Sequence, residues 1–199
     1  MVATAPLVTA QVEDALGRAA ARHDRPCPRQ VLGVRMGIAA AEALGLAIPA
    51  SDHRLLALVE TDGCFVDGIE AATGCSLGHR TLRLYDCGRV AATFVDVDSG
   101  RAVRVAPRPD VRERAGEFAP DEYRRFYAQL DAYQVMPDDE LLHIEEVALE
   151  IDLVALLGQK GVRVDCVACG EEIINGREQR TAAGPLCPAC VGGMYYRRR

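Results

Sequence analysis

Residues 23–45, HDRPCPRQVLGVRMGIAAAEALG, begin with a histidine and a cysteine four residues apart and continue into a helical pattern. Pro28 suits the first position of a helix, because its φ is fixed and its missing N–H would have no partner there. Gly45 suits the residue that ends a helix. The stretch therefore predicts a helix from Pro28 to the residue before Gly45, with Cys27 at its N-cap. Either Cys27 is a small buried apolar group beside an incidental His23, or both side chains are ligands aimed at one point.

On either side of this helix the chain alternates between helical and strand-like segments. The patterns predict helices over residues 8–22, 64–73 and, in two pieces, 110–133, and strands over 54–60, 81–86, 88–98, 101–107 and 143–151. We expect the three consecutive strands from residue 81 to form an antiparallel meander, Pro120 to open the second helix of 110–133, and residues 153–161 to form an exit turn. The fold class is α+β, an antiparallel sheet with covering helices and a small C-terminal zinc-ribbon module.

The length and the charge distribution indicate two domains. A chain of 199 residues can form one core of ordinary size and one small attached module. We expect an α+β domain over residues 1–159 and a four-cysteine zinc-binding module over residues 160–199. The charge changes at this boundary, because the module has seven basic and four acidic residues, a net +3, and the remainder has a net charge of −9.

The composition is typical of a cytoplasmic globular protein. Hydrophobic residues make up 49% of the chain and charged residues 26%, the formal net charge is −6, and there is no Trp. These values argue against a stacking surface for nucleic acid. No apolar run approaches the roughly 18 residues that span a bilayer, and the N-terminal stretch lacks both the basic start and the apolar segment of a secretory signal. We therefore expect no membrane association, a cytoplasmic location and reduced thiols.

Four of the eight cysteines form two closely spaced pairs near the C-terminus. CVACG at 166–170 and CPAC at 187–190 give two C-x2-C turns with seventeen residues between them. Four thiolates at about 2.3 Å from a zinc ion complete a tetrahedral site, and each turn presents two of them. Because such a site has no open coordination position, we expect it to be structural and to supply folding energy that so small a module lacks. The predicted ligands are Cys166, Cys169, Cys187 and Cys190; the alternative is that they are ordinary core residues.

The remaining cysteines are Cys27, Cys64, Cys75 and Cys87. Cys27 and Cys64 lie at predicted helix N-termini, where the helix dipole lowers the pKa of a thiol and favours metal binding. Cys75 lies roughly 16 Å from Cys64 along a straight helix, so one ion cannot bind both within one copy of the chain. His23, Cys27 and Cys64, with Asp67 one turn further on as a fourth ligand or a base, would leave a position for solvent, as in reactive metal sites. Alternatively, both cysteines are buried small hydrophobes and His23 is a surface residue.

Three separated blocks resemble the FmdE family of formylmethanofuran dehydrogenase proteins in sequence and order. They are HDRPCPRQVLGVRMG (23–37), VETDGCFVDGIEAATGCSLGHRTLRLYDCGRVAATF (59–94) and CVACGEEIINGREQRTAAGPLCPACVGG (166–193). The family pattern is approximately H-G-H-x-C-P-G-x-x-L-G-x-R-M, then E-x-x-x-C-x-x-D-x-x-Q-x-x-T-G-C-T-x-G-K-G-N-L, then a strand containing A-x-x-F, and a terminal zinc ribbon. The resemblance implies a metal-binding, often dimeric protein that serves as an accessory or subunit of a molybdenum or tungsten formylmethanofuran dehydrogenase-like oxidoreductase. It implies metal positions at His23, Cys27, Cys64, Asp67 and Cys75, and at the four ribbon cysteines.

The chain departs from this pattern near the first site. Arg25 replaces the second histidine, and its guanidinium cannot ligate a metal because it stays protonated. Arg29 replaces a glycine, Ala71 replaces a glutamine, and G-K-G-N-L has become GHRTL. We therefore expect fewer protein ligands and more positive charge at this site than in the family pattern, with His79 as a replacement nitrogen.

These observations favour a zinc-binding accessory protein with two metal sites. The structural ion is expected to be zinc, and the second ion zinc as well, although Cys and His ligands also suit Fe, Ni or Cu. One alternative is a zinc-ribbon module that binds nucleic acid or a protein partner, with structural N-terminal cysteines. Another is a thiol enzyme with Cys27 or Cys64 as nucleophile. The expected partners are a second copy of the chain and a redox-enzyme subunit; no substrate or catalytic residue is assigned.

Overall fold

The computed structural model describes residues 10–21, 25–158, 161–194 and 196, and the chain divides into two compact units, Met1–Ala148 and Leu149–Arg199. This division falls earlier than the domain boundary at residue 159 that the sequence predicted. The second unit contains a helix, α7 (Leu153–Leu157), where the sequence predicted an exit turn. That prediction was wrong because Asp152 caps a short helix: its carboxylate accepts a hydrogen bond from the N–H of Ala155 at 2.9 Å.

The N-terminal unit is built on a five-stranded sheet. Its strands are β1 (Leu55–Val59), β2 (Leu82–Leu84), β3 (Ala92–Asp96), β4 (Ala102–Pro107) and β5 (Leu142–Val147), in the order β2-β1-β3-β4-β5. Neighbouring strands are antiparallel except for β1 and β2, which are parallel. This sheet and its helices confirm the predicted α+β class with a mainly antiparallel sheet.

The strand order corrects the meander predicted from residue 81 onward. β3 and β4 pair as predicted, but β2 lies on the far side of β1. All five residues of β1 are buried, so this strand takes an inner position with a partner on each side. The chain between β1 and β2 contains a helix of ten residues, and a crossover of this kind leads to parallel pairing.

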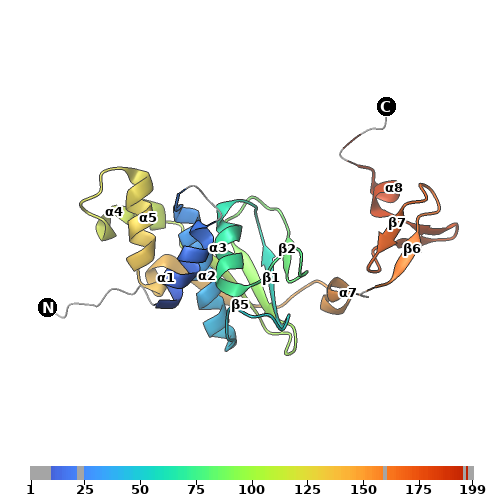
Figure 1. Ribbon diagram of the computed structural model, residues 1–199, viewed down its shortest axis with the longest axis horizontal. Helices are drawn as coiled ribbons and strands as arrows, with labels where there is room; N and C mark the ends of the chain where they lie inside the picture. The colour runs from blue at the N-terminus through green and yellow to red at the C-terminus, as the bar shows by residue number, and fades with distance from the viewer. Residues whose placement is uncertain (1–9, 22–24, 159–160, 195, 197–199) are drawn as a thin grey trace. The chain divides into compact units, whose positions relative to one another are not determined.

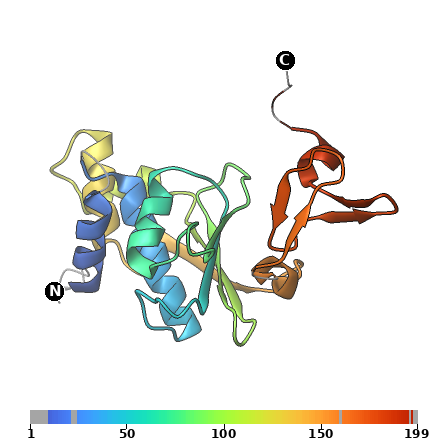
Figure 2. The ribbon, with the colours of Figure 1, turned by 45° about the vertical axis from the view of Figure 1, so that its right-hand side comes forward.

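Helix α2 is the central helix of this unit. The described helices are α1 (Ala10–Ala20), α2 (Pro28–Leu44), α3 (Cys64–Thr73), α4 (Val111–Phe118), α5 (Arg125–Val135) and α6 (Asp138–Leu141). Most of the 17 residues of α2 are buried, and the helix contacts α1, α3, α5 and the sheet (Figure 1; Figure 2). α5 begins at Arg125 rather than Pro120, because the Glu122 carboxylate accepts the N–H of Arg124 at 2.8 Å and holds a turn before the helix.

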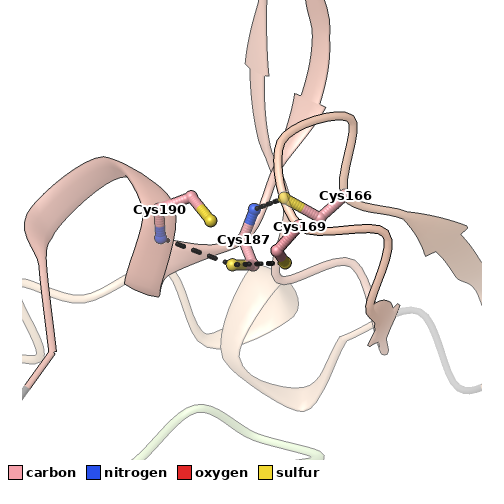
Figure 3. A group of neighbouring side chains, drawn as sticks. All are labelled: Cys166, Cys169, Cys187 and Cys190. Carbon is pink, nitrogen blue, oxygen red and sulfur yellow. Dashed lines mark hydrogen bonds between the residues drawn. The ribbon is translucent and has the colours of Figure 1, made fainter. Parts of the chain in front are cut away.

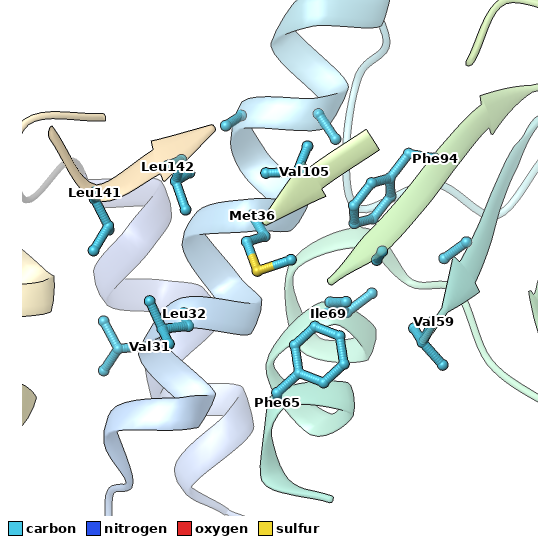
Figure 4. Close-up of a cluster of buried hydrophobic side chains, with 14 of the residues drawn as sticks. Val31, Leu32, Met36, Val59, Phe65, Ile69, Phe94, Val105, Leu141 and Leu142 are labelled. Atoms are coloured by element: carbon cyan, nitrogen blue, oxygen red, sulfur yellow. The ribbon is translucent and has the colours of Figure 1, made fainter. Parts of the chain in front are cut away.

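The core lies between the helices and the sheet. Met36 of α2 points toward Phe65 and Ile69 of α3, and Phe94 and Val105 of the sheet line the same cluster (Figure 4). These five side chains are all fully buried. Of the described helices, none is long and apolar enough to cross a membrane.

Two glycines let α2 and α3 approach until their backbones touch. A Cβ at Gly33 would clash with the carbonyl oxygen of Phe65, and one at Gly68 would clash with that of Gln30. Any larger residue would push the helices apart. The close crossing brings the first turns of both helices together, and Cys27 and Cys64 lie at those two ends.

The C-terminal unit has two small hairpins and little core of its own. It contains β6 (Arg163–Asp165) paired with β7 (Glu172–Ile174), β8 (Gln179–Thr181) paired with β9 (Gly184–Leu186), and the helix α8 (Pro188–Gly192). Among its described residues only Cys166 and Ile173 are buried. So small an apolar core cannot offset the entropy of ordering the chain, so this unit needs another source of stability.

Candidate metal centres

The four C-terminal cysteines converge on one point. Cys166 and Cys169 lie in the turn after β6, and Cys187 and Cys190 lie at the start of α8 (Figure 3). Their sulfur atoms all lie within 4.8 Å of one another, and the Cys169 and Cys187 sulfurs are 3.9 Å apart. Two thiolates on a tetrahedral zinc ion are about 3.8 Å apart if each Zn–S bond is about 2.3 Å. The group can therefore hold a metal ion, as the sequence predicted.

Backbone amides and neighbouring thiols set the proton affinity of this group. The N–H of Cys187 donates to the Cys166 sulfur at 3.3 Å, and this bond is the main cause that lowers the pKa of Cys166 to about 6. The pKa of Cys190 is raised to about 12, first by its contact with the Cys187 thiol and then by the other two cysteines. One thiolate is thus favoured, but four anions this close need a cation between them.

Cys27 and Cys64 share a second, smaller site in the N-terminal unit. Cys27 is the N-cap of α2, and Gln30 fixes this end: its side-chain oxygen accepts the N–H of Cys27 at 3.1 Å, and its Nε2 donates to the carbonyl of Ala19 at 3.0 Å. Cys64 is the first residue of α3. Both cysteines line one cavity of about 210 Å³, together with Pro28, Arg29, Leu32, Arg112, Phe126, Gln129 and Tyr133.

The pKa of Cys64 differs from the expectation for a helix N-terminus. Burial raises the pKa of this thiol, and the neighbouring Cys27 thiol raises it further; the charge of Asp67 acts in the same direction. The hydrogen bond from its own backbone lowers the pKa but is outweighed. Cys64 is therefore protonated at neutral pH unless a cation lies beside it.

The other predicted positions are distributed around this cavity or away from it. His23 lies outside the described residues. Among the residues that the structure does describe, the carboxylate of Asp67 does not join the Cys27 and Cys64 sulfurs in a group close enough to share one ion. Cys75 is buried, and its thiol donates to the carbonyl of Leu55 at 3.4 Å. Its role as a ligand, implied by the family resemblance, stays a prediction.

His79 lies at a different cavity, so it does not supply the expected replacement nitrogen beside Cys27 and Cys64. Its ring packs edge-on against His53, with the ring centroids 5.9 Å apart. Both rings line a cavity of about 370 Å³ with Ala50, Ser51, Gly74 and Thr81. Cys87 is exposed, and its thiol donates to the carbonyl of Tyr85 at 3.3 Å.

Sequence reasoning missed the wall that α5 contributes to the Cys27 and Cys64 cavity. Phe126, Gln129 and Tyr133 recur at spacings of three and four residues, so they share one face of this helix. The spacing is visible in the sequence, but the polar character of the segment favours a role as scaffold or cover. Only the packing of α5 against α2 assigns this face to the cavity.

Fold and cysteine geometry together define an α+β protein with a separate four-cysteine module that can hold a metal ion. The family profile described as FmdE, molybdenum formylmethanofuran dehydrogenase operon, matches residues 22–143, and the chain belongs to this family.

Two individual proteins are similar to the chain. A protein of Archaeoglobus fulgidus, named a probable S-adenosyl-L-methionine-binding protein, is 30% identical over 196 residues. The match covers 89% of this chain but 52% of that protein, so the chain spans about half the length of this curated relative. A crystal structure of a tungsten formylmethanofuran dehydrogenase FmdE-like protein from Syntrophus aciditrophicus superposes with a TM-score of 0.61. It is 23% identical, and the match covers 98% of this chain and 100% of that one.

Proposed function

We propose that this chain is a metal-binding accessory protein with one ion in each unit. A zinc ion bound by Cys166, Cys169, Cys187 and Cys190 stabilises the C-terminal unit. A second ion, also zinc, is bound by Cys27 and Cys64 with His23, and Asp67 acts on the site through its charge. The observation that carries the proposal is that two thiols from separate helix N-termini line one cavity, where the Cys27 thiol adds to the effect of burial in raising the pKa of Cys64.

The two sites have different chemical roles because an outside molecule can reach the ion at only one of them. Four thiolates saturate a tetrahedral ion, so the C-terminal site is structural. At the other site, Cys27, Cys64 and His23 would hold the ion with three protein ligands, and the ion would supply Lewis-acid chemistry to an outside molecule. The buried side chains of Leu32 and Tyr133 line the same cavity as the thiols, and Gln30 fixes Cys27 at the helix end.

The partner is proposed from the family. The family description names the formylmethanofuran dehydrogenase operon, which supports a role as an accessory or subunit of a molybdenum or tungsten oxidoreductase of that kind in the cytoplasm. We also propose a homodimer, as the resemblance implies. Sedimentation equilibrium of the purified chain tests this, since a monomer at micromolar concentration would contradict it.

Metal analysis of protein purified without an affinity tag tests the two-site proposal. We expect two zinc ions per wild-type chain and one in Cys27→Ala and in Cys64→Ala, with unchanged far-UV circular dichroism. Cys87→Ala is the matched control, because Cys87 is exposed and lies outside both sites; it should keep two ions. A single ion that survives Cys27→Ala, together with salt-dependent DNA binding, would instead favour the zinc-ribbon binding module.

A further inference from the structure

The cavity beside Cys27 and Cys64 is positively charged although the unit around it is acidic. Residues 1–159 have a net charge of −9, yet among the residues that the structure describes the charged side chains that line this cavity are Arg29 and Arg112. Neither arginine forms an ion pair with any residue that the structure describes. Within the described part of the chain, both guanidinium groups are therefore available to an anion from solution.

Two helices place these arginines at the cavity, and a third helix adds a tyrosine. Arg29 lies in the first turn of α2, at a position where the family pattern has glycine. Arg112 lies in the first turn of α4. The charge of Arg112 also reaches the Tyr133 hydroxyl of α5, because it lowers the pKa that burial raises for this group. Two arginines and one tyrosine thus line the same cavity.

The other side chains that line the cavity suit a small ligand that is partly apolar. Leu32 and Tyr133 are buried, and Phe126, which is 42% exposed, lines the cavity with them. A volume of about 210 Å³ lies below the roughly 300–1,000 Å³ of pockets for drug-sized ligands, which limits the occupant to a small molecule. The negative net charge of residues 1–159 disfavours an extended polyanion such as DNA.

We infer that this cavity binds a small organic anion, whose carboxylate or phosphate group pairs with Arg29 and Arg112 while its apolar body packs on Leu32 and Phe126. The anion site deepens the proposed function, since it names the class of molecule that would reach an ion at Cys27 and Cys64. The arginine contacts themselves do not require that ion.

Isothermal titration calorimetry with benzoate and phenyl phosphate tests the inference, with benzyl alcohol as the uncharged probe. Both anions should bind saturably to the wild-type protein, and the alcohol should not. Arg29→Gln and Arg112→Gln should each weaken anion binding about tenfold, which corresponds to about 1.4 kcal/mol. Arg101→Gln is the control, because Arg101 is an exposed arginine of the same unit that pairs with Glu146 at 2.9 Å and does not line the cavity. The tighter anion distinguishes a carboxylate site from a phosphate site.

The same titration with Cys27→Ala separates this inference from the proposed metal site. Anion binding that persists in Cys27→Ala supports the arginine site whether or not metal analysis finds a second ion. The inference is wrong if neither anion binds to the wild-type protein, or if Arg29→Gln and Arg112→Gln both bind as tightly as the wild type.

Discussion

Gly33 and Gly68 lie where the backbones of α2 and α3 touch. Because a Cβ at Gly33 would clash with the backbone of Phe65, Gly33→Ala must separate the helices. We expect this change to lower the free energy of unfolding by about 2 kcal/mol, measured by urea denaturation, and to lower the affinity of the Cys27 and Cys64 site for metal. Gly17→Ala is the control: no atom lies within 4 Å of its added Cβ, so the same change in α1 should be neutral or stabilising.

Asp96 ties the end of β3 to the residue before β1. It is 3% exposed, accepts two hydrogen bonds from Arg54 at 2.8 and 2.9 Å, and accepts a third from the Ser99 hydroxyl at 2.6 Å. The Arg54 guanidinium is the main cause that holds the pKa of Asp96 well below its usual range. A carboxylate with a lowered pKa stabilises the folded state above its unfolded pKa of about 3.9, and this contribution is lost as the pH falls further.

We therefore expect Asp96→Asn to cost about 2 kcal/mol of unfolding free energy at pH 7, since Arg54 is partly exposed and screened by solvent. The difference from wild type should shrink below about pH 4. Urea denaturation at several pH values measures it. Asp98→Asn is the control, because Asp98 is 71% exposed and lies 3.4 Å from Arg54. An equal cost of Asp96→Asn at pH 7 and pH 3 would contradict the role of the ion pair.

At the level of single residues, the sequence predicted that Cys27 and Cys64 lie close together, but not the direction in which the pKa of Cys64 is shifted. Cys27 and Cys64 could be paired from the sequence because the helix starts are encoded locally by Pro28 and by the Asp62-Gly63 turn. The pKa of Cys64 was predicted in the wrong direction, because the helix dipole is a local effect whereas burial depends on neighbours distant in sequence. The arginines at the cavity were visible as charges, and only the fold brings Arg29 and Arg112 together.

At the level of helices and strands, Arg35, a buried residue of α2, holds α5 in position. Arg35 is 4% exposed, and its guanidinium donates to the carbonyls of Tyr133 at 2.9 Å and Met136 at 2.8 Å and to the carboxylate of Asp138 at 2.6 Å. These acceptors lie at the C-terminal end of α5 and just beyond it. Arg35 thereby holds the helix whose other residues form one wall of the Cys27 and Cys64 cavity.

Arg35→Met should lower the free energy of unfolding by about 3 kcal/mol, because it leaves buried carbonyls without donors. Amide hydrogen exchange in α5 should also speed up relative to the strands. Arg101→Met is the control: Arg101 and Glu146 are both exposed, so loss of their pair should cost less than about 1 kcal/mol. Unchanged exchange in α5 would show that packing alone holds this helix.

Local patterns predicted most elements and failed where contacts between distant segments decide. α2 and α3 were predicted with their ends because proline, glycine and turn residues mark them in the sequence. The position of β2 was missed because strand order depends on which strand is buried on both sides, and the strand pattern of residues 81–86 says nothing about its partner.

For the whole molecule, the uneven cysteine distribution and the charge change predicted two parts with different sources of stability. The core of the N-terminal unit extends over its helices and its sheet, including Met36, Phe65 and Phe94. The described part of the C-terminal unit buries only Cys166 and Ile173. Burial of apolar side chains is therefore enough to stabilise the N-terminal unit. It cannot be the main source of stability for the C-terminal unit.

Removal of metal should consequently unfold one unit and leave the other intact. With a strong chelator, or in Cys187→Ser, we expect the amide resonances of residues 161–194 to collapse into the unfolded range. The chelator removes the ion and Cys187→Ser removes one of its four ligands, so in both cases the unit loses the folding energy that the bound ion supplies. The thermal transition of the N-terminal unit should remain, since its core contains no ligand of the C-terminal site. NMR spectra and calorimetry of the full chain measure both effects, with Cys87→Ser as the control. Dispersed resonances of the C-terminal unit without metal would mean that its hairpins fold without an ion, and the four thiols would then need another explanation.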